Sequence, residues 1–403
     1  MRIAFISYEY PQDTADGGIA TYTRQAARML CARGHQVEVF AASRHRSGTT
    51  AEDGLLVHRI EAQTKPEFPG RIGPIFAARH AAAPFDVLES PENNADAREA
   101  IRLVPQIPLV VRLHTPRYLT NALNAPTHGL TPQVGEDGEA REELRPLPGY
   151  DPARDPECRL TRQADEIVAP SQAIGEIVGA AWNLDADRIA HIPNPYAPNE
   201  ALLRLPVATQ TGVVTYLGRL EMRKGVLDLA RAIPLIVQRR PDARFRFIGR
   251  AKESPQPGMD MRRYLECALQ DYRDCVEFVG PVPLDAVPSL LGATDVCVFP
   301  SLWENFPCVC LEAMAAARGI VGSAAGGMAE MLEGGATGCL IPPHRPDRIA
   351  AEVLRLLENP ALRMQMGQAA RARVCAEYSA ERIAALQEAG YARAIARHGG
   401  PPP

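Results

Sequence analysis

Two carboxylates stand eight residues apart at a junction where a short apolar strand gives way to a helix. The strand is expected over Val296–Phe299, Pro300 ends it, and the helix begins after Pro307. Glu304 then lies in the loop and Glu312 early in the helix. A carboxylate accepts hydrogen bonds from two hydroxyls at once, and a helix N-terminus suits a phosphate. The junction therefore predicts a site for a ligand with hydroxyls and phosphate, such as a sugar nucleotide.

A second loop with phosphate-binding character joins an expected strand to a helix at Gly218–Gly225. Only three of the 44 basic residues are lysine, namely Lys65, Lys224 and Lys252, so arginine is the default cation of this chain. A position that keeps lysine favours a compact, strongly hydrated charge. We therefore expect Lys224 and its neighbour Arg219 to contact phosphate rather than to lie on a solvated turn.

The elements that position these loops alternate between strand and helix along most of the chain, which predicts an α/β fold with two parallel sheets. In the first half we expect strands at 3–7, 36–41, 55–60, 86–89, 109–113, 166–169 and 188–192. In the second half we expect strands at 212–217, 244–248, 275–279, 296–299, 320–323 and 338–341. Each series is typical of a Rossmann-like domain.

Three segments depart from this alternation. Residues 115–156 are rich in Pro, Gly and acids, and we interpret them as a long loop that acts as a lid. Residues 193–211 have the composition of a domain linker, and 399–403 form a frayed tail. The expected domains are 1–200 and 201–378, followed by 379–403, which holds a last helix.

The bulk composition is that of an ordinary globular enzyme. The chain has 403 residues, of which 46% are hydrophobic and 23% charged, and its net charge is −4. We find no basic stripe for nucleic acid, no apolar run that approaches a membrane span and no signal-peptide core, so we expect a cytoplasmic protein. The nine scattered cysteines predict reduced thiols and no zinc site.

The segment Pro300-Ser-Leu-Trp-Glu-Asn-Phe-Pro, followed by Leu311-Glu-Ala-Met-Ala, resembles the E-x7-E motif of retaining GT-B glycosyltransferases of family four. The loop Gly218-Arg-Leu-Glu-Met-Arg-Lys-Gly is similar to the G-R-x4-K-G phosphate loop of that family. The resemblance implies two Rossmann-like domains facing across a cleft, with C-terminal helices that cross back. It also implies transfer of a sugar from a UDP- or GDP-linked donor to an acceptor hydroxyl, with retention and without metal or other cofactor.

The resemblance implies roles for individual residues as well. Arg219 and Lys224 would hold the diphosphate, Glu304 the hydroxyls of the donor sugar, and Glu312 the ribose. From the other domain, the ring and carbonyl of His114 would contact the donor sugar. Further donor-binding positions would be Gly17 and Gly18 before the first helix, Gly218, Asn305, Phe306, Pro307, and Glu330 of a G-G-x-x-E segment, which is otherwise simply a helix N-terminal acid.

Other functions remain as alternatives. A GT-B sugar-nucleotide epimerase or an inactive binding subunit shares the fold, whereas the loops of dinucleotide and Walker-type sites are absent from the sequence. Asp185 and Asp187 spell a D-x-D pair, which we expect in a surface turn without metal. Acidic residues outnumber basic ones in 1–200, including Glu9, Asp13, Asp16, Glu89 and Glu92. This favours a soluble acceptor over a lipid-linked one, and an amine-bearing acceptor or a neutral polyol.

Overall fold

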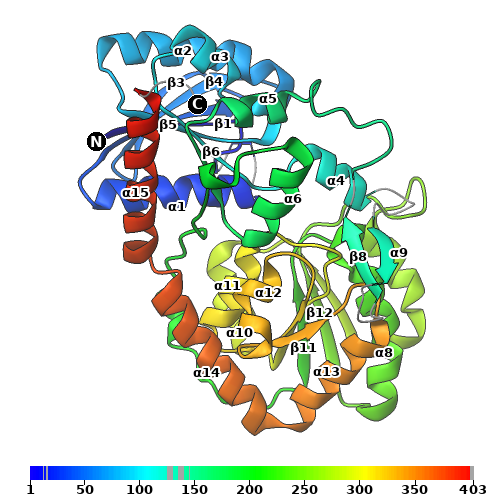
Figure 1. Cartoon of the computed structure of the whole chain (residues 1–403). Helices are drawn as coiled ribbons and strands as arrows, with labels where there is room; N and C mark the ends of the chain where they lie inside the picture. The colour runs from blue at the N-terminus through cyan, green and yellow to red at the C-terminus, as the bar shows by residue number, and fades with distance from the viewer. Residues whose placement is uncertain (12, 15–16, 125–129, 135–139, 145, 400–403) are drawn as a thin grey trace. The chain divides into compact units, whose positions relative to one another are not determined.

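The computed structural model of the chain describes residues 1–11, 13–14, 17–124, 130–134, 140–144 and 146–399. The chain forms two compact units (Figure 1). Unit 1 comprises Met1–Ala122, Pro132–Ala197 and Tyr378–Pro403, and unit 2 comprises Leu123–Thr131 and Pro198–Glu377. The boundaries drawn from the sequence followed residues 200 and 378 and gave no part of 123–131 to the second unit.

The described part of unit 1 is built on an eight-stranded sheet with the order β10-β9-β6-β5-β1-β2-β4-β3. Every pair is parallel except β3 with β4, so the parallel sheet predicted from the alternation is confirmed. The strands are β1 (Arg2–Ser7), β2 (Gln36–Ser43), β3 (Gly48–Glu52), β4 (Leu55–Glu61), β5 (Val87–Pro91), β6 (Leu109–Arg112), β9 (Glu166–Ala169) and β10 (Ile189–His191). The helices are α1 (Gly18–Ala32), α2 (Phe68–Ala82), α3 (Arg98–Leu103), α4 (Arg117–Asn124), α5 (Pro156–Gln163), α6 (Gln172–Trp182) and α15 (Ala380–His398).

The described part of unit 2 holds a six-stranded sheet with the order β13-β12-β11-β14-β15-β16, in which all pairs are parallel. Its strands are β11 (Val213–Leu217), β12 (Arg244–Ile248), β13 (Val276–Gly280), β14 (Val296–Phe299), β15 (Gly319–Ser323) and β16 (Cys339–Ile341). Its helices are α7 (Glu200–Leu203), α8 (Val226–Arg239), α9 (Met261–Ala268), α10 (Val287–Gly292), α11 (Cys308–Ala315), α12 (Met328–Met331), α13 (Pro346–Glu358) and α14 (Pro360–Glu377).

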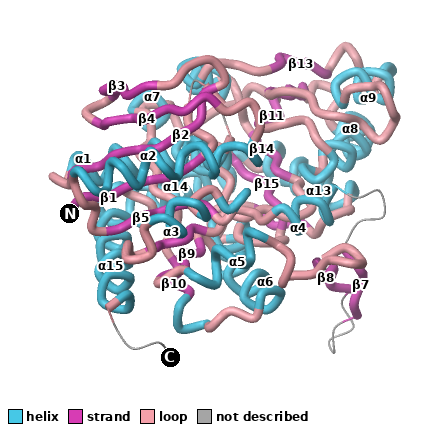
Figure 2. The backbone as a smooth tube through the Cα atoms, turned by 90° about the horizontal axis from the view of Figure 1, so that it is seen from above, coloured by secondary structure: helices cyan, strands magenta, loops and turns pink. Residues whose placement is uncertain are grey.

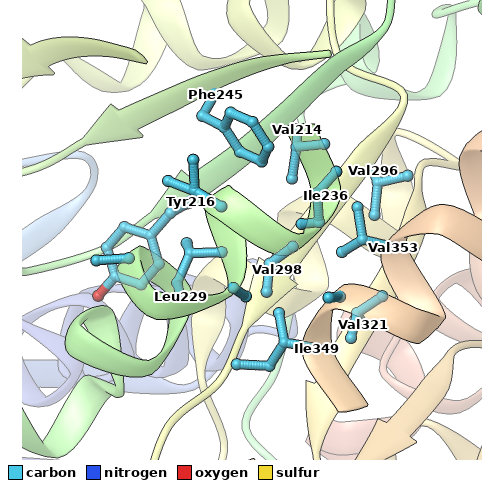
Figure 3. Close-up of a cluster of buried hydrophobic side chains, with 14 of the residues drawn as sticks. Val214, Tyr216, Leu229, Ile236, Phe245, Val296, Val298, Val321, Ile349 and Val353 are labelled. Carbon is cyan, nitrogen blue, oxygen red and sulfur yellow. The ribbon is translucent and has the colours of Figure 1, made fainter. Parts of the chain in front are cut away.

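The core of unit 2 explains why its central strands read as continuous apolar runs. All four residues of β14 are buried, since a strand in the middle of a parallel sheet has helices on both faces. Figure 3 shows side chains of β11, β12, β14 and β15 packed against α8 and α13. The labelled residues of this cluster are Val214, Tyr216, Leu229, Ile236, Phe245, Val296, Val298, Val321, Ile349 and Val353.

The last helix belongs to the first unit. The chain leaves unit 2 at the end of α14 and continues into α15, which packs against α1, β5, β6 and β9 of unit 1 (Figures 1 and 2). Ile383, Ala384, Tyr391 and Ala394 of α15 are members of the buried cluster of unit 1. The helix expected to return to the first domain does so.

One edge strand was not expected. β3 is short, polar and mostly exposed, so it lacks the apolar alternation that reveals a strand. It pairs antiparallel with β4 through the two-residue turn Asp53-Gly54, whose φ angles are 52° and 80°. Asp-Gly is the preferred sequence of such a hairpin turn, and this signal was present in the chain.

The interpretation of residues 115–156 as an irregular loop is wrong for much of its described part. The segment contains α4, and β7 (Leu130–Val134) pairs with β8 (Ala140–Leu144) in a separate two-stranded sheet. Residues 125–129, 135–139 and 145 lie outside the described residues. The proposed role as a lid stays a prediction.

The expected linker is also more ordered than its composition indicated. It contains α7, and three arginines of unit 2 donate to its backbone carbonyls. Arg318 bonds the carbonyl of Pro206 and Arg363 that of Thr209, while Arg371 donates to Leu205 at 2.9 Å. Arg318 and Arg363 are almost fully buried. Such charge-assisted bonds fix the chain from about residue 202 onward as part of unit 2.

Candidate active site

The two predicted phosphate- and hydroxyl-binding loops come together where the strand order of unit 2 reverses. From β11 the chain proceeds outward to β12 and β13, then returns to β14 on the other side of β11. In open parallel sheets, ligands bind outside the carboxyl ends of the strands at such a reversal. The loop after β11 carries Arg219 and Lys224, and the loop after β14 carries Glu304. The sheet topology thus places both motifs at one edge.

The loop after β11 adopts a conformation that requires glycine at its ends. Gly218 has φ 148° and Gly225 has φ 68°, and a Cβ at Gly225 would lie 1.8 Å from the carbonyl oxygen of Pro300. The hydroxyl of Tyr216 donates to the carbonyl of Arg219 at 2.6 Å. The N–H of Leu302 donates to the carbonyl of Arg223 at 2.8 Å, so the loop lies against the neighbouring loop, which carries Glu304.

Lys224 and Glu304 form an ion pair, and this direct contact was not predicted. The ammonium of Lys224 contacts Oε1 of Glu304, which also accepts from Ser301 Oγ at 3.1 Å. Arg223, which the sequence analysis missed, lies 3.9 Å from the same oxygen. Burial alone would raise the pKa of Glu304, but the charges of Lys224 and Arg223 outweigh it and hold the pKa below its usual value. Glu304 is therefore an ionised acceptor at neutral pH.

A small pocket opens beside this ion pair within unit 2. It is bounded by the end of β11, the end of β14 and the first turns of α11 and α12. Its lining residues are Tyr216, Leu217, Gly218, Lys224, Phe299, Ser301, Glu304, Pro307, Val309 and Met328. Besides Lys224 and Glu304, two further predicted site residues, Gly218 and Pro307, thus line this pocket.

Arg219 occupies a more open position than Lys224. Its side chain is about half exposed (48%) and its guanidinium lies 3.1 Å from Glu221, which is 2.9 Å from Arg223. The sequence offered no signal for Arg223 because arginine is the common cation of this chain. Arg219, Arg223 and Lys224 together give the loop three positive charges, with Glu221 and Glu304 as their carboxylate partners.

The G-G-x-x-E segment supports the loop that carries Glu304. Gly326 and Glu304 form a parallel bridge, and the N–H of Gly327 donates to the carbonyl of Glu304 at 2.8 Å. A Cβ at Gly326 would lie 2.1 Å from that carbonyl oxygen. Glu330 follows in the first turn of α12, partly exposed, and its backbone carbonyl accepts from Arg373. The structure therefore gives the two glycines a positioning role toward Glu304.

Glu312 differs from Glu304 in its surroundings. It lies on α11 next to the buried Leu311 and Ala313 and is itself partly exposed. Its carboxylate makes no hydrogen bond or ion pair with any described residue. Burial raises its pKa to about 7, because nothing compensates the cost of its charge. Asn305 and Phe306 are buried in the loop before the helix. Glu312 is thus a carboxyl with open acceptor capacity on the helix whose first turn lines the pocket.

The predicted residues of unit 1 lie at the corresponding reversal of its own sheet, between β1 and β5, or beside it. Gly17 precedes α1, whose first turn is capped by no described side chain, and a Cβ at Gly18 would meet nothing within 4 Å. His114 follows β6, and its N–H donates to Glu92 at 2.8 Å. Burial, and then the charges of Arg112 and Lys65, lower the pKa of His114 to about 3, so its ring is neutral.

The acids expected to make an electronegative acceptor wall are mostly neutralised. Glu9 pairs with Lys65 at 2.6 Å, Asp13 pairs with Arg59, and Glu89 is buried beside Arg112. Burial and the nearby charge of Glu157 raise the pKa of Glu92 to about 8. Asp16 lies outside the described residues. The acidic count of residues 1–200 therefore does not translate into an acidic surface at these described positions, and the kind of acceptor stays a prediction.

Metal-binding clusters and membrane-spanning helices are both absent from the described residues. Among the described residues, no group of three or more His, Cys, Asp or Glu side chains is placed to hold a metal ion. Asp185 caps a short 3₁₀ turn by accepting from the N–H of Asp187 at 3.0 Å, as expected for a surface turn. No helix in the described part of the chain is both long and apolar enough to span a membrane.

Comparison with known proteins agrees with this geometry. The profile of Glycosyltransferase Family 4 matches residues 16–200, and that of Glycosyl transferases group 1 matches residues 211–359. A D-inositol 3-phosphate glycosyltransferase of Pseudarthrobacter chlorophenolicus is 28% identical over 428 residues, which span 99% of this chain and 97% of that protein.

Solved structures share the fold over nearly the whole chain. Sucrose-phosphate synthase from Thermosynechococcus elongatus superposes with a TM-score of 0.77 at 24% identity, covering 98% of this chain and 99% of that one. Anabaena HepE, solved in complex with UDP and glucose, has a TM-score of 0.67 at 19% identity, covering 96% and 98%. With two profiles that together span both units, the chain belongs to family 4 of the glycosyltransferases, the group 1 enzymes, and has the GT-B fold.

Proposed function

We propose that the protein is a retaining glycosyltransferase that moves a sugar from a nucleoside-diphosphate sugar to a hydroxyl of a small polyol or saccharide, without a catalytic metal. The observation that carries the proposal is the pocket at the strand reversal of unit 2, which Lys224 and Glu304 line as an ion pair. The helix that follows, α11, carries Glu312 and contributes Val309 to the same pocket. This arrangement offers cations for a diphosphate and carboxylates for sugar and ribose hydroxyls.

In the proposed reaction the bond between the anomeric carbon and the diphosphate oxygen breaks, and that oxygen keeps the electron pair. Arg219 and Lys224 stabilise the growing negative charge, as preorganised cations do in a partly dry site. The acceptor oxygen bonds the anomeric carbon on the same face, and its proton passes to a phosphate oxygen of the donor. Glu304 and Glu312 orient hydroxyls, and neither needs to act as a nucleophile.

The choice of a small acceptor rests on relatives rather than on charge. The relative from Pseudarthrobacter chlorophenolicus is named for an inositol phosphate, which is a small hydroxylated molecule. The paired acids of unit 1 suit neutral hydroxyls at least as well as amines. HepE was solved with UDP, which supports a uridine donor as the first to test.

A donor and acceptor screen tests the proposal directly. The enzyme would be incubated with UDP- and GDP-sugars and with inositols, inositol phosphates, sugar phosphates, aminocyclitols or polyprenyl-linked sugars, and nucleoside-diphosphate release and product mass would be measured. Transfer to a small acceptor with an α-configured product from an α-configured donor is expected. Product from the lipid-linked acceptor alone, rearranged sugar from donor alone, or an inverted product would each refute it.

Replacing Glu312 and replacing Glu304 should have different effects on nucleotide binding. Glu312→Ala should weaken binding of the free nucleoside diphosphate by on the order of tenfold, because only Glu312 is assigned to the ribose. Glu304→Ala should leave that affinity nearly unchanged and lower turnover of the sugar donor. Isothermal titration of both variants with nucleoside diphosphate measures the difference. An equal loss of affinity in both variants would contradict the assignment.

The raised pKa of Glu312 predicts a pH dependence of the same binding step. The pKa of Glu312 is about 7, so at a pH below this value its carboxyl is mostly protonated and accepts hydroxyl hydrogen bonds less well. Lowering the pH from 8 to 6 should therefore weaken nucleoside-diphosphate binding by about tenfold. The ligand's own phosphate also titrates in this range, so the matched control is Glu312→Gln. Wild type and this variant should differ in pH dependence, and parallel curves would exclude Glu312.

Metal independence is the remaining proposal about the chemistry. Transfer should persist after exhaustive dialysis against EDTA, because Arg219 and Lys224 take the place of a cation at the diphosphate. Activity in EDTA and after addition of Mg²⁺ or Mn²⁺ would be compared with the same donor and acceptor. A complete loss that either ion restores would show that the reaction needs a metal.

A further inference from the structure

A buried polar network joins the C-terminal helix to the sheet of unit 1. Its members Tyr22, Glu89, Arg112, Gln387 and Tyr391 are all at most 3% exposed. The carboxylate of Glu89 accepts from Tyr22 at 2.5 Å, from Tyr391 at 2.6 Å and from Gln387 at 2.8 Å. Arg112 lies 3.4 Å from Glu89. A carboxylate at this depth needs several partners, and α15 supplies two of them.

The same network fixes the ring of Tyr22. The hydroxyl of Tyr22 accepts from Gln387 at 2.9 Å in addition to its bond to Glu89. The guanidinium of Arg112 lies over the Tyr22 ring, 4.2 Å from its centroid. Contacts to its face and to its hydroxyl leave the ring little freedom to turn.

Tyr22 in turn contacts His114. The two rings pack edge to face, with centroids 5.4 Å apart and an interplanar angle of 64°. The N–H of His114 is held separately by Glu92. Glu92 therefore fixes the backbone of His114. The ring of His114 packs against Tyr22, whose own orientation depends on residues of α15.

We propose that Gln387 and Tyr391 of the C-terminal helix are positioning residues for His114, acting through Glu89 and Tyr22. The inference rests on the proposed function together with the role that the family resemblance implies for His114, which is a contact to the donor sugar. A contact to the sugar helps only when the ring occupies its productive position, and a displacement of about 1 Å costs up to a hundredfold in rate. The last helix would then determine turnover without touching substrate.

Two conservative variants test this role. Tyr391→Phe removes a single hydroxyl, and Gln387→Met keeps the length of the side chain but removes its amide. Each should lower kcat by on the order of tenfold and leave nucleoside-diphosphate affinity unchanged, since that ligand is assigned to unit 2. The ring proton resonance of His114, identified by its absence from the His114→Ala spectrum, should shift in both. An unchanged kcat and resonance in a folded Tyr391→Phe protein would overturn the proposal.

The matched control is Glu388→Ala on the same helix. Glu388 anchors α15 to the turn that follows α1 through Arg33 at 2.6 Å and His35 at 2.9 Å. Within the described part of the chain, its side chain makes no hydrogen bond or ion pair with Tyr22, Glu89 or Arg112. This variant should loosen the helix yet keep kcat and the His114 resonance. An equal loss of kcat in Glu388→Ala would mean that the network contributes only to general stability, and it would refute the positioning role.

A double-mutant cycle separates this inference from the proposed function. If Gln387 acts through His114, Gln387→Met should cause little further loss of kcat in a His114→Ala background. Additive losses would overturn the inference and leave the role of His114 intact. If His114→Ala itself has normal kcat, the proposed function of His114 fails first, and the inference fails with it.

Discussion

Replacing Lys224 with alanine is expected to lower kcat/KM by on the order of a hundredfold or more. Two effects add in this variant. The diphosphate loses a cation at the moment its negative charge grows, and Glu304 is left as a buried carboxylate without its closest partner. The pKa of Glu304 should then rise, so turnover should fall further as the pH is lowered toward 5. Steady-state kinetics between pH 5 and 8 measure both effects.

The chain offers a matched control for this experiment. Lys252 is exposed in the loop after β12, and Lys252→Ala should keep wild-type kinetics. Arg219→Ala should also lose on the order of a hundredfold, but without the added pH sensitivity, because Arg219 pairs with Glu221 rather than with Glu304. Near-normal turnover in both Lys224→Ala and Arg219→Ala would remove the diphosphate role of this loop.

Gly225→Ala should damage both activity and stability. A Cβ at this position would lie 1.8 Å from the carbonyl oxygen of Pro300, which is backbone and cannot turn away. Either the loop with Lys224 or the loop with Glu304 must move, and we expect a loss of at least a hundredfold in kcat/KM. The clash and the left-handed backbone together should cost about 2–4 kcal/mol, which lowers Tm by on the order of 5–10 °C.

Gly258→Ala separates the effect of the steric clash from the effect of the left-handed backbone. Gly258 has a similar φ of 78°, but a Cβ there would meet nothing within 4 Å. This variant should show only the backbone cost of about 1 kcal/mol and normal kinetics. Calorimetry and steady-state assays of both variants make the comparison. If Gly225→Ala and Gly258→Ala have the same Tm and the same kcat/KM, the close approach of the two loops does not matter for activity.

The sequence predicted the parallel strands of unit 2 well because each is a short apolar run between turn signals. The predicted bounds of β12 and β14 are those of the structure. The E-x7-E and G-R-x4-K-G motifs also fall at the strand reversal that the topology defines. Local composition and the family motifs therefore indicate the same strand ends, because a short apolar run between turn signals is typical of a buried parallel strand.

What the sequence could not show is which charges meet. Glu304 contacts Lys224 across 80 residues of chain, and Glu9 meets Lys65 across 56. Neither pairing has a local signature, so Glu9 and Asp13 were counted as free acids. Burial was hidden as well: Glu92 and Asp96, which look like surface acids, are inside unit 1 with pKa values raised to about 8 and about 7.

The return of α15 to unit 1 has a consequence for how the chain is made. Unit 2 is almost continuous in sequence and has all its strands once residue 341 has been synthesised. Unit 1 begins with the first residue, yet its core includes Ile383, Ala384 and Tyr391. The core of the N-terminal unit therefore cannot be complete until every strand of unit 2 has been synthesised. Until then the sheet of unit 1 must exist without the helix that covers part of it.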